Sequence, residues 1–400
     1  MTRQVHEGQP WILPLISDEE IQRRHRRLRE EMVKRDIGCL VIAGSQGNYG
    51  GGGDHVRYLS NYGIYYGEGY LVFPASGEVR MFCRSANQAQ NFQAVSSITA
   101  QISSYPTFSR DVVNYVKDLK LDRGNIGIVG IEVMPANFFL DLQQKLSGAN
   151  LLFVTEILLE MRFIKGAEEL AFVEEAGEIA DCSYEAILGA AKPGRKEYEV
   201  YAAVDEALTA HGANSPSFIL LCSGPSPIFP YTPSSHRTLK FQDTILEEIS
   251  PCYGGLWVQW GRPFTIGKPD NEMRELYKVA MEVYQFVHER IKPGVTFEGL
   301  IKAAHDLITK NGYTWMAPAI QFVGLDCTEM AYMTKGTPKN VELVPRPMDK
   351  RPFEPGSVIV NQPSVVTKDL RKGTLIIDTV IVTQDGCKPV TKAPLEYAQI

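Results

Sequence analysis

The stretch "KPGRKEYEVYAAVDEALTAHG" (residues 192–212) returns at an offset of 100 residues as "KPGVTFEGLIKAAHDLITKNG" (residues 292–312). The two copies share an opening Lys-Pro-Gly, a central alanine, a threonine and a closing glycine. Each copy follows a segment with the apolar spacing of a long helix and precedes strand-like segments. Chance similarity of two amphipathic helices is the alternative, but it leaves the identical opening unexplained. The duplication predicts two half-domains related by a pseudo-twofold axis, with a pocket at their junction.

The part of the chain before this repeat alternates strand and helix signals. Short apolar runs bounded by glycine and proline occur at 39–44, 69–74 and 125–130, and residues 135–146 have helical spacing. The composition shifts near residue 160, where a long helix is expected over 167–188. We therefore predict an α/β chain with an N-terminal α/β domain over 1–160 and a second, larger domain over 161–400.

Composition excludes several classes of protein. The formal net charge is −6, and the densest basic run, "RRHRRLR" (23–29), fits a solvated helix face, so no nucleic-acid partner is expected. Apolar stretches are too short for a membrane span, so no membrane partner is expected either. Seven cysteines without a CxxC pair indicate reduced thiols, and no signal-peptide pattern is visible, which together predict a cytoplasmic protein.

Four segments in chain order resemble those of one known family. They are "RFIKGAEELAFVEEAGEIAD" (162–181), "GLDCTE" (324–329), "GSVIVNQPS" (356–364) and "LIIDTVIVTQDGCKPVT" (375–391). The chain is similar to the "pita-bread" family of creatinase, prolidase, aminopeptidase P and methionine aminopeptidase. The resemblance implies a small creatinase-like α/β domain followed by a pita-bread domain with an internal pseudo-twofold repeat. It also implies a homodimer in which an N-terminal loop reaches the partner's site.

The family's metallopeptidases bind two metal ions with two aspartates, one histidine and two glutamates. The resemblance places these five ligands on Glu248, Gln259, Gln321, Gln362 and Ile377. A dinuclear site needs about four carboxylates to balance its charge, and this set retains a single one. We therefore expect that the chain binds no metal and no other cofactor, and that it is not a metallopeptidase.

Two residues are the candidates for catalysis. Glu248, beside no metal and partly buried, should have a raised pKa and could act as a general base or acid; a structural carboxylate bonded to neighbouring amides is the alternative. Tyr231 stands where creatinase-like enzymes have a histidine. It could protonate a leaving group or stabilise an oxyanion, or simply fill the space of that histidine.

The remaining candidates would bind substrate. Buried amides need hydrogen-bond partners, so Gln259, Gln321 and Gln362 favour a small polar ligand, and Thr328 and Glu329 lie in the adjacent "GLDCTE" motif.

The glycine-rich stretch 44–70 follows a strand, but no helix pattern continues it, which argues against a phosphate loop. By resemblance, His55 and Tyr66 in this stretch could contact the partner's substrate; a mobile surface loop is the plain alternative.

These expectations lead to one leading hypothesis and two competitors. The leading hypothesis is a metal-independent hydrolase of a C–N or amide bond in a small polar molecule, with Glu248 activating water. The first competitor is a metal-free lyase that abstracts a proton and eliminates a leaving group. The second is a non-catalytic binding module that uses the old peptidase cleft.

Overall fold

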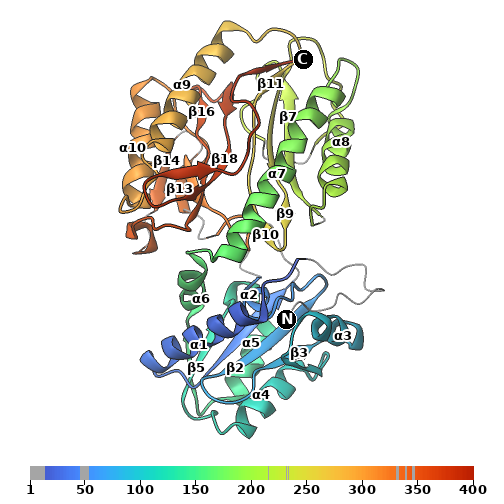
Figure 1. Cartoon of the computed structure of the whole chain (residues 1–400), viewed down its shortest axis with the longest axis vertical. Helices are drawn as coiled ribbons and strands as arrows, with labels where there is room; N and C mark the ends of the chain where they lie inside the picture. The colour runs from blue at the N-terminus through green and yellow to red at the C-terminus, as the bar shows by residue number, and fades with distance from the viewer. Residues whose placement is uncertain are drawn as a thin grey trace. The chain divides into compact units, whose positions relative to one another are not determined.

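The structure is a computed structural model that describes residues 14–45, 54–214, 216–230, 232, 234–329, 333–337, 340–344 and 347–400. The chain divides into two compact units, Met1–Phe163 and Ile164–Ile400 (Figure 1). The sequence placed the boundary between residues 160 and 161; the contacts place it just after helix α6 (Thr155–Arg162).

Strands of the N-terminal unit form one mixed sheet in the order β4-β3-β2-β1-β5-β6. The three apolar runs seen in the sequence become β1 (Cys39–Ser45), β2 (Glu68–Pro74) and β5 (Asn125–Val129). Strand β1 pairs antiparallel with β2 and parallel with β5. The other strands of this sheet are β3 (Arg80–Cys83), β4 (Thr99–Ile102) and β6 (Asn150–Phe153).

Helices pack on both faces of this sheet. Helices α4 (Phe108–Asp118) and α5 (Ala136–Lys145) share a buried core with one face, where the Tyr70 ring stacks on Phe138 at 3.7 Å. Phe73 points to the opposite face because side chains alternate along a strand, and there it meets His25 of α1 (Asp18–Lys34) edge-on at 5.0 Å. The remaining helices are α2 (His55–Ser60), α3 (Ala86–Val95) and η1 (Ile131–Val133).

The two copies of the sequence repeat occupy equivalent places in the C-terminal unit. The first Lys-Pro-Gly joins α7 (Ala167–Ala190) to α8 (Glu197–Ala210), and the second joins α9 (Asn271–His288) to α10 (Phe297–Lys310). Gly194 and Gly294 have φ of 90° and 88°, a conformation that side chains disfavour. Their N–H groups donate to backbone oxygens of Leu239 (2.9 Å) and Phe353 (3.0 Å). Both copies of the repeat therefore need glycine at this position for the same reason, a turn with a positive φ.

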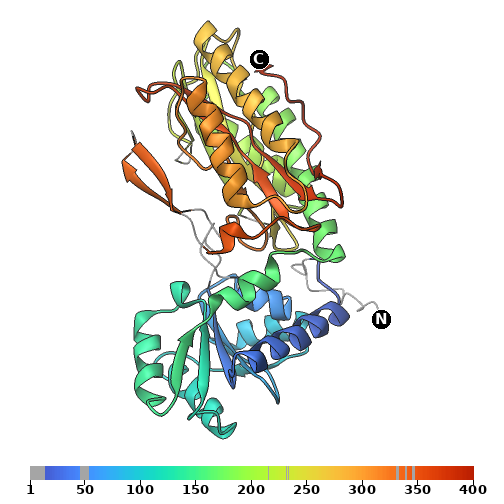
Figure 2. The ribbon, with the colours of Figure 1, turned by 90° about the vertical axis from the view of Figure 1, so that its left-hand side faces the viewer.

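Each helix pair packs with its own sheet. The first sheet has the order β20-β11-β8-β7 and the second has the order β12-β15-β18-β19. Their strands are β7 (Phe218–Gly224), β8 (Thr244–Ser250), β11 (Phe264–Thr265), β20 (Ala398–Gln399), β12 (Ile320–Phe322), β15 (Val358–Asn361), β18 (Asp378–Val382) and β19 (Cys387–Pro389). Three short hairpins complete the unit: β9 (Cys252–Tyr253) with β10 (Leu256–Trp257), β13 (Met333–Thr337) with β14 (Asn340–Val344), and β16 (Ser364–Val366) with β17 (Gly373–Leu375). The β13–β14 hairpin extends away from the rest of the unit (Figure 2).

The two sheets meet at Trp260 and Gly261. Trp260 bridges to Ile249 of the first sheet, and Gly261 bridges to Ile377 beside the second. A Cβ atom on Gly261 would lie 2.5 Å from the backbone oxygen of Glu247, so only glycine allows this approach. The pocket that the sequence predicted at this junction stays a prediction.

Two local predictions are wrong. The stretch after the glycine-rich run does form a helix, α2, although it has only six residues. The basic run on α1 is also not wholly solvated, because Arg24 and His25 are 2% and 5% exposed. Arg24 donates to the backbone oxygen of Tyr58 (3.0 Å), and His25 Nε2 lies 2.7 Å from that of Leu59. The last carbonyls of a helix lack partners within it, and these two side chains satisfy those of α2.

Among the described residues, none of the helices combines the length and apolarity that crossing a bilayer requires.

Candidate active site

Strand β8 carries two adjacent glutamates, Glu247 and Glu248, whose side chains lie on opposite faces of the sheet because side chains alternate along a strand. Glu247 is completely buried, and its Oε1 accepts a 2.6 Å hydrogen bond from the backbone N–H of Arg262. Burial raises the pKa of Glu247 well above its ordinary range. This carboxyl therefore belongs to the protein core.

Glu248 faces the other way and is 9% exposed. Within the described part of the chain, no hydrogen bond or ion pair engages its carboxyl group. Burial without a partner raises the pKa of Glu248 to about 7. A carboxyl with such a pKa is populated in both protonation states near neutral pH, which suits it to general acid–base chemistry. The predicted rise in pKa is confirmed in direction, and its cause is loss of solvent.

Three glutamine side chains form one hydrogen-bonded network in the C-terminal unit. The amide nitrogen of Gln321 donates to Oε1 of Gln259 and, at 3.0 Å, to Oε1 of Gln362. Gln362 Nε2 donates to the backbone oxygen of Pro318 (2.9 Å), and Gln259 Nε2 to that of Cys327 (3.1 Å). These amides hydrogen-bond to one another, and the oxygen of Gln321 is an acceptor to which no described residue donates. That a ligand binds to these side chains stays a prediction.

Cys327 connects this network to Glu248, and the sequence analysis did not single it out. Its thiol lies 3.5 Å from Gln259 Nε2 and is 1% exposed. Burial raises the pKa of Cys327 to about 12, and the nearby charge of Glu248 raises it further. A thiol in this state stays protonated and is a weak nucleophile. Its position within the "GLDCTE" motif was the only sequence signal available.

The fifth position, Ile377, offers no ligand atom and is 1% exposed. The next residue, Asp378, is fully engaged by Arg262, whose Nη2 lies 2.8 and 2.9 Å from the two carboxylate oxygens. The Tyr284 hydroxyl also donates to Asp378, at 2.7 Å. This carboxylate is therefore part of a buried ion pair.

The residues at the ligand positions do not fit a dinuclear metal centre. They offer one carboxyl group, three neutral amides and an isoleucine, and the oxygens of Gln259 and Gln362 already accept hydrogen bonds from Gln321. Divalent transition metals prefer charged oxygen, imidazole or thiolate ligands. Across the described residues, no group of three or more His, Cys, Asp or Glu side chains could hold a metal ion.

The two other predicted residues of the "GLDCTE" motif lie in different surroundings. Thr328 is partly exposed and follows Cys327 directly. Glu329 is 2% exposed and pairs with Lys165 Nζ at 2.8 Å, while its other oxygen accepts from the N–H of Leu325 (2.9 Å). Its carboxylate holds the 324–329 loop against the start of the C-terminal unit.

The predicted residue Tyr231 lies outside the described residues. His55 and Tyr66 belong to the N-terminal unit and differ sharply in exposure. His55 is completely buried, with Arg162 Nη1 donating to its Nδ1 at 3.2 Å. Tyr66 is 70% exposed, and the Arg84 guanidinium lies 5.2 Å from the centre of its ring.

Comparison with known proteins places this geometry in context. The family model for metallopeptidase family M24 matches residues 171–384, and that for the creatinase/prolidase N-terminal domain matches residues 24–164. An Xaa-Pro dipeptidase of Pyrococcus horikoshii is 26% identical over 272 residues, which cover 67% of this chain and 74% of the relative. A Mycobacterium tuberculosis protein named probable dipeptidase PepE is 30% identical over 266 residues, covering 66% and 67%.

Solved structures show the same fold. The prolidase from Pyrococcus horikoshii superposes with a TM-score of 0.77 at 23% identity, covering 93% of this chain and 99% of its own. The dipeptidase PepE from Mycobacterium ulcerans superposes with a TM-score of 0.80 at 22% identity, covering 97% and 100%. The predicted fold, a creatinase-like α/β domain followed by a pita-bread domain, is confirmed.

These comparisons correct the predicted function. The relatives are dipeptidases of a metallopeptidase family, so the metal-independent hydrolase of a small polar molecule, the lyase and the non-catalytic binding module are wrong. The expectation that the chain is not a metallopeptidase has no support among them. The prediction of an enzyme, and of a hydrolase, agrees with the relatives. With more than half of its length matched by the family model, the chain belongs to metallopeptidase family M24.

Proposed function

We propose that the chain hydrolyses the amide bond of short peptides, with Xaa-Pro dipeptides as the first substrates to test, and that Glu248 is its proton acceptor. The observation that carries the proposal is the Glu248 carboxyl, which no described residue engages by a hydrogen bond or ion pair and whose pKa burial raises to about 7. The substrate class rests on the relatives, two of which are named Xaa-Pro dipeptidase.

The chain's own groups divide the work as follows. The Glu248 carboxylate takes a proton from water while the water oxygen attacks the carbonyl carbon of the scissile bond. The same carboxyl then returns the proton to the leaving nitrogen, so that Glu248 ends in its starting state. Gln321 offers its amide oxygen, to which no described residue donates, to an N–H group of the substrate, and the network with Gln259 and Gln362 holds that amide in place.

The amide network also limits what the cleft accepts. A ligand can hydrogen-bond to the Gln321 oxygen without breaking an existing bond, whereas a group that needs the Gln321 nitrogen must compete with two of them. Breaking a buried hydrogen bond and leaving its acceptor unpaired costs about 1–3 kcal/mol. The cleft therefore favours substrates that present donors there, such as an amine or an amide N–H.

Glu248→Gln tests the assignment, with Glu247→Gln as the matched control. Glutamine cannot accept a proton, so Glu248→Gln should lower kcat on an Xaa-Pro dipeptide by about 10²-fold or more. Burial favours the protonated form of Glu247, for which glutamine is the neutral isostere, so Glu247→Gln should leave kcat nearly unchanged. Release of the free amino acids is followed by chromatography. Equal loss in both variants would show that the assignment of Glu248 is wrong.

The homodimer, the cytoplasmic location and a contact of the N-terminal loop with a partner's substrate stay predictions of the resemblance and composition. Sedimentation velocity of the purified chain tests the first of them.

A further inference from the structure

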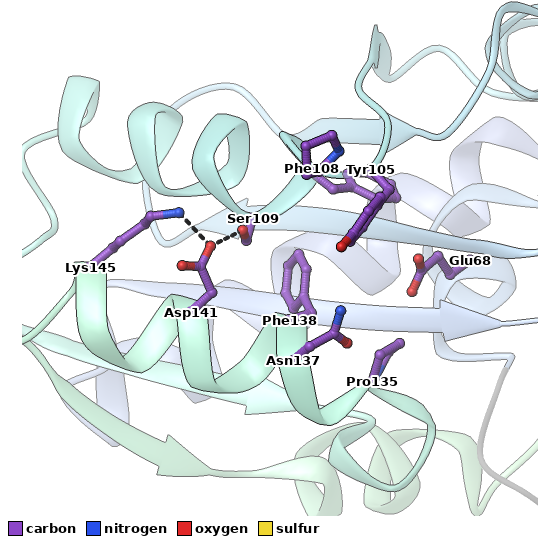
Figure 3. A pocket seen from close by; sticks show the side chains of 10 residues that line it. Glu68, Tyr105, Phe108, Ser109, Pro135, Asn137, Phe138, Asp141 and Lys145 are labelled. Atoms are coloured by element: carbon purple, nitrogen blue, oxygen red, sulfur yellow. Dashed lines mark hydrogen bonds and ion pairs between the residues drawn. The ribbon is translucent and has the colours of Figure 1, made fainter.

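The N-terminal unit contains a pocket of about 330 Å³ between the loop leading into α4, the start of α5 and the start of β2 (Figure 3). Three separate segments line it, near residues 68, 105–109 and 135–145. All of these residues belong to the N-terminal unit, so the pocket is complete without the C-terminal cleft.

The middle of the pocket is apolar and held firmly in place. Figure 3 shows the Phe138 ring between the polar side chains of the two ends. Phe138 is 6% exposed and stacks on Tyr70 at 3.7 Å, and Phe108, 5% exposed, meets Tyr70 edge-on at 4.9 Å. These contacts fix the aromatic wall before any ligand arrives.

One end of the pocket is already neutralised. The Asp141 carboxylate accepts hydrogen bonds from Lys145 and from the Ser109 hydroxyl, drawn as dashed lines in Figure 3. The Lys145 contact, followed by the Ser109 contact, holds the pKa of Asp141 below its usual range. This pair adds no net charge to the pocket.

The other end carries the Glu68 carboxylate. The Glu68 carboxylate is partly buried and accepts a 2.8 Å hydrogen bond from the Tyr70 hydroxyl. Within the described ranges, no Lys, Arg or His side chain forms an ion pair with Glu68. The Asn137 side chain and the hydroxyl of Tyr105 lie at the same end (Figure 3). This end therefore offers one carboxylate and two neutral oxygens as acceptors.

We propose that this pocket binds a small organic cation, a primary ammonium or guanidinium group attached to a short apolar chain or ring. The cationic group pairs with Glu68, and its remaining N–H donors reach the oxygens of Asn137 and Tyr105. The apolar part lies against Phe138 and Phe108, whose rings also attract a positive charge. A carboxylate or phosphate ligand is disfavoured because Glu68 would repel it.

Isothermal titration of the full chain with benzylamine tests the proposal, with benzyl alcohol as the neutral probe of similar shape. Benzylamine should bind saturably and at least about tenfold more tightly than benzyl alcohol. Glu68→Gln removes the charge but can still accept the Tyr70 hydrogen bond, so it should fold normally and weaken benzylamine binding at least about tenfold. Glu30→Gln, an exposed carboxylate on α1, is the matched control and should leave the affinity unchanged.

Two further variants locate the bound amine. Asn137→Ala, at an exposed position, should weaken binding, and Glu248→Gln should leave it unchanged because that residue lies in the other unit. Absence of saturable benzylamine binding, equal affinity for benzyl alcohol, or an affinity that survives Glu68→Gln would each overturn the proposal. Binding that is lost in Glu248→Gln but kept in Glu68→Gln would overturn it as well, by assigning the amine to the C-terminal cleft.

Discussion

Replacement of Glu248 by glutamine should stabilise the C-terminal unit at neutral pH by far more than it does in acid. Burial raises the pKa of the Glu248 carboxyl to about 7 in the folded chain, against an ordinary value of 4.5. Since a tenfold change in an ionisation constant corresponds to about 1.4 kcal/mol, ionising this buried group costs about 3 kcal/mol of folding free energy. Glutamine has a similar shape and never ionises, so the variant escapes this cost.

The direction follows from proton binding. The folded pKa lies above the unfolded one, so between about pH 4.5 and pH 7 the folded chain binds more protons at this site. The stability of the wild-type chain must therefore fall as pH rises through that window. Below about pH 4.5 Glu248 is protonated in both the folded and the unfolded chain. The difference in the free energy of unfolding between variant and wild type is then a constant that reflects packing alone. Above about pH 7 both states are ionised and the difference reaches its plateau.

Urea unfolding at a series of pH values from about 4 to about 8 measures this difference. Tryptophan fluorescence is the natural signal because Trp257, Trp260 and Trp315 all lie in the C-terminal unit. Other titrating groups occur in both proteins and cancel in the comparison, including the buried Glu247. Glu30→Gln should parallel the wild type at every pH. Wild-type and Glu248→Gln curves that stay parallel across the range would refute the reasoning, because the carboxyl would then titrate as it does in water.

Three other outcomes are expected. Asp378→Asn leaves the buried Arg262 guanidinium without its carboxylate partner. The free energy of unfolding measured in urea should fall by about 3–5 kcal/mol. A loss below about 1 kcal/mol would contradict a buried ion pair. Gly194→Ala and Gly294→Ala each place a side chain on a residue with a left-handed backbone conformation. Each substitution should lower the free energy of unfolding by about 1–2 kcal/mol in the same assay. Equal losses would agree with equivalent turns. Calorimetric titration with Mn²⁺ should show fewer than two bound ions per chain, because the residues at the ligand positions lack the carboxylates that two divalent cations need. Two tightly bound ions would show that these residues do fit a dinuclear centre.

Local patterns predicted the fold well because the relevant forces act over short distances along the chain. The runs at 39–44, 69–74 and 125–130 become buried strands, since their apolar side chains and bounding glycines or prolines suit no other element. The Lys-Pro-Gly repeat marks equivalent turns because both glycines must adopt a positive φ. Helix α2 was missed because it has six residues, too few for helical periodicity to show.

Side-chain partners were harder to predict because residues distant in the sequence supply them. Glu329 was expected to contact substrate, which stays a prediction, and its partner Lys165, 164 positions away in the chain, was not foreseen. Cys327 went unnoticed because only the folded chain places its thiol beside Gln259. The predicted function failed for another reason: the residue types at the ligand positions were used to reject the peptidase class, whereas the relatives that share this fold are dipeptidases.

The amide network gives a physical reason why these segments stay together although their residues do not fit a metal centre. Gln321 comes from β12, Gln362 follows β15, and Gln259 lies between β10 and β11, so the hydrogen bonds join three separate segments of the C-terminal unit. A dinuclear centre would join such segments through charge, which demands several carboxylates close together. Hydrogen bonds between neutral amides join the same segments without any net charge. The network therefore supplies no positive charge that would stabilise the ionised form of Glu248. The raised pKa of Glu248 follows from the burial of its carboxyl.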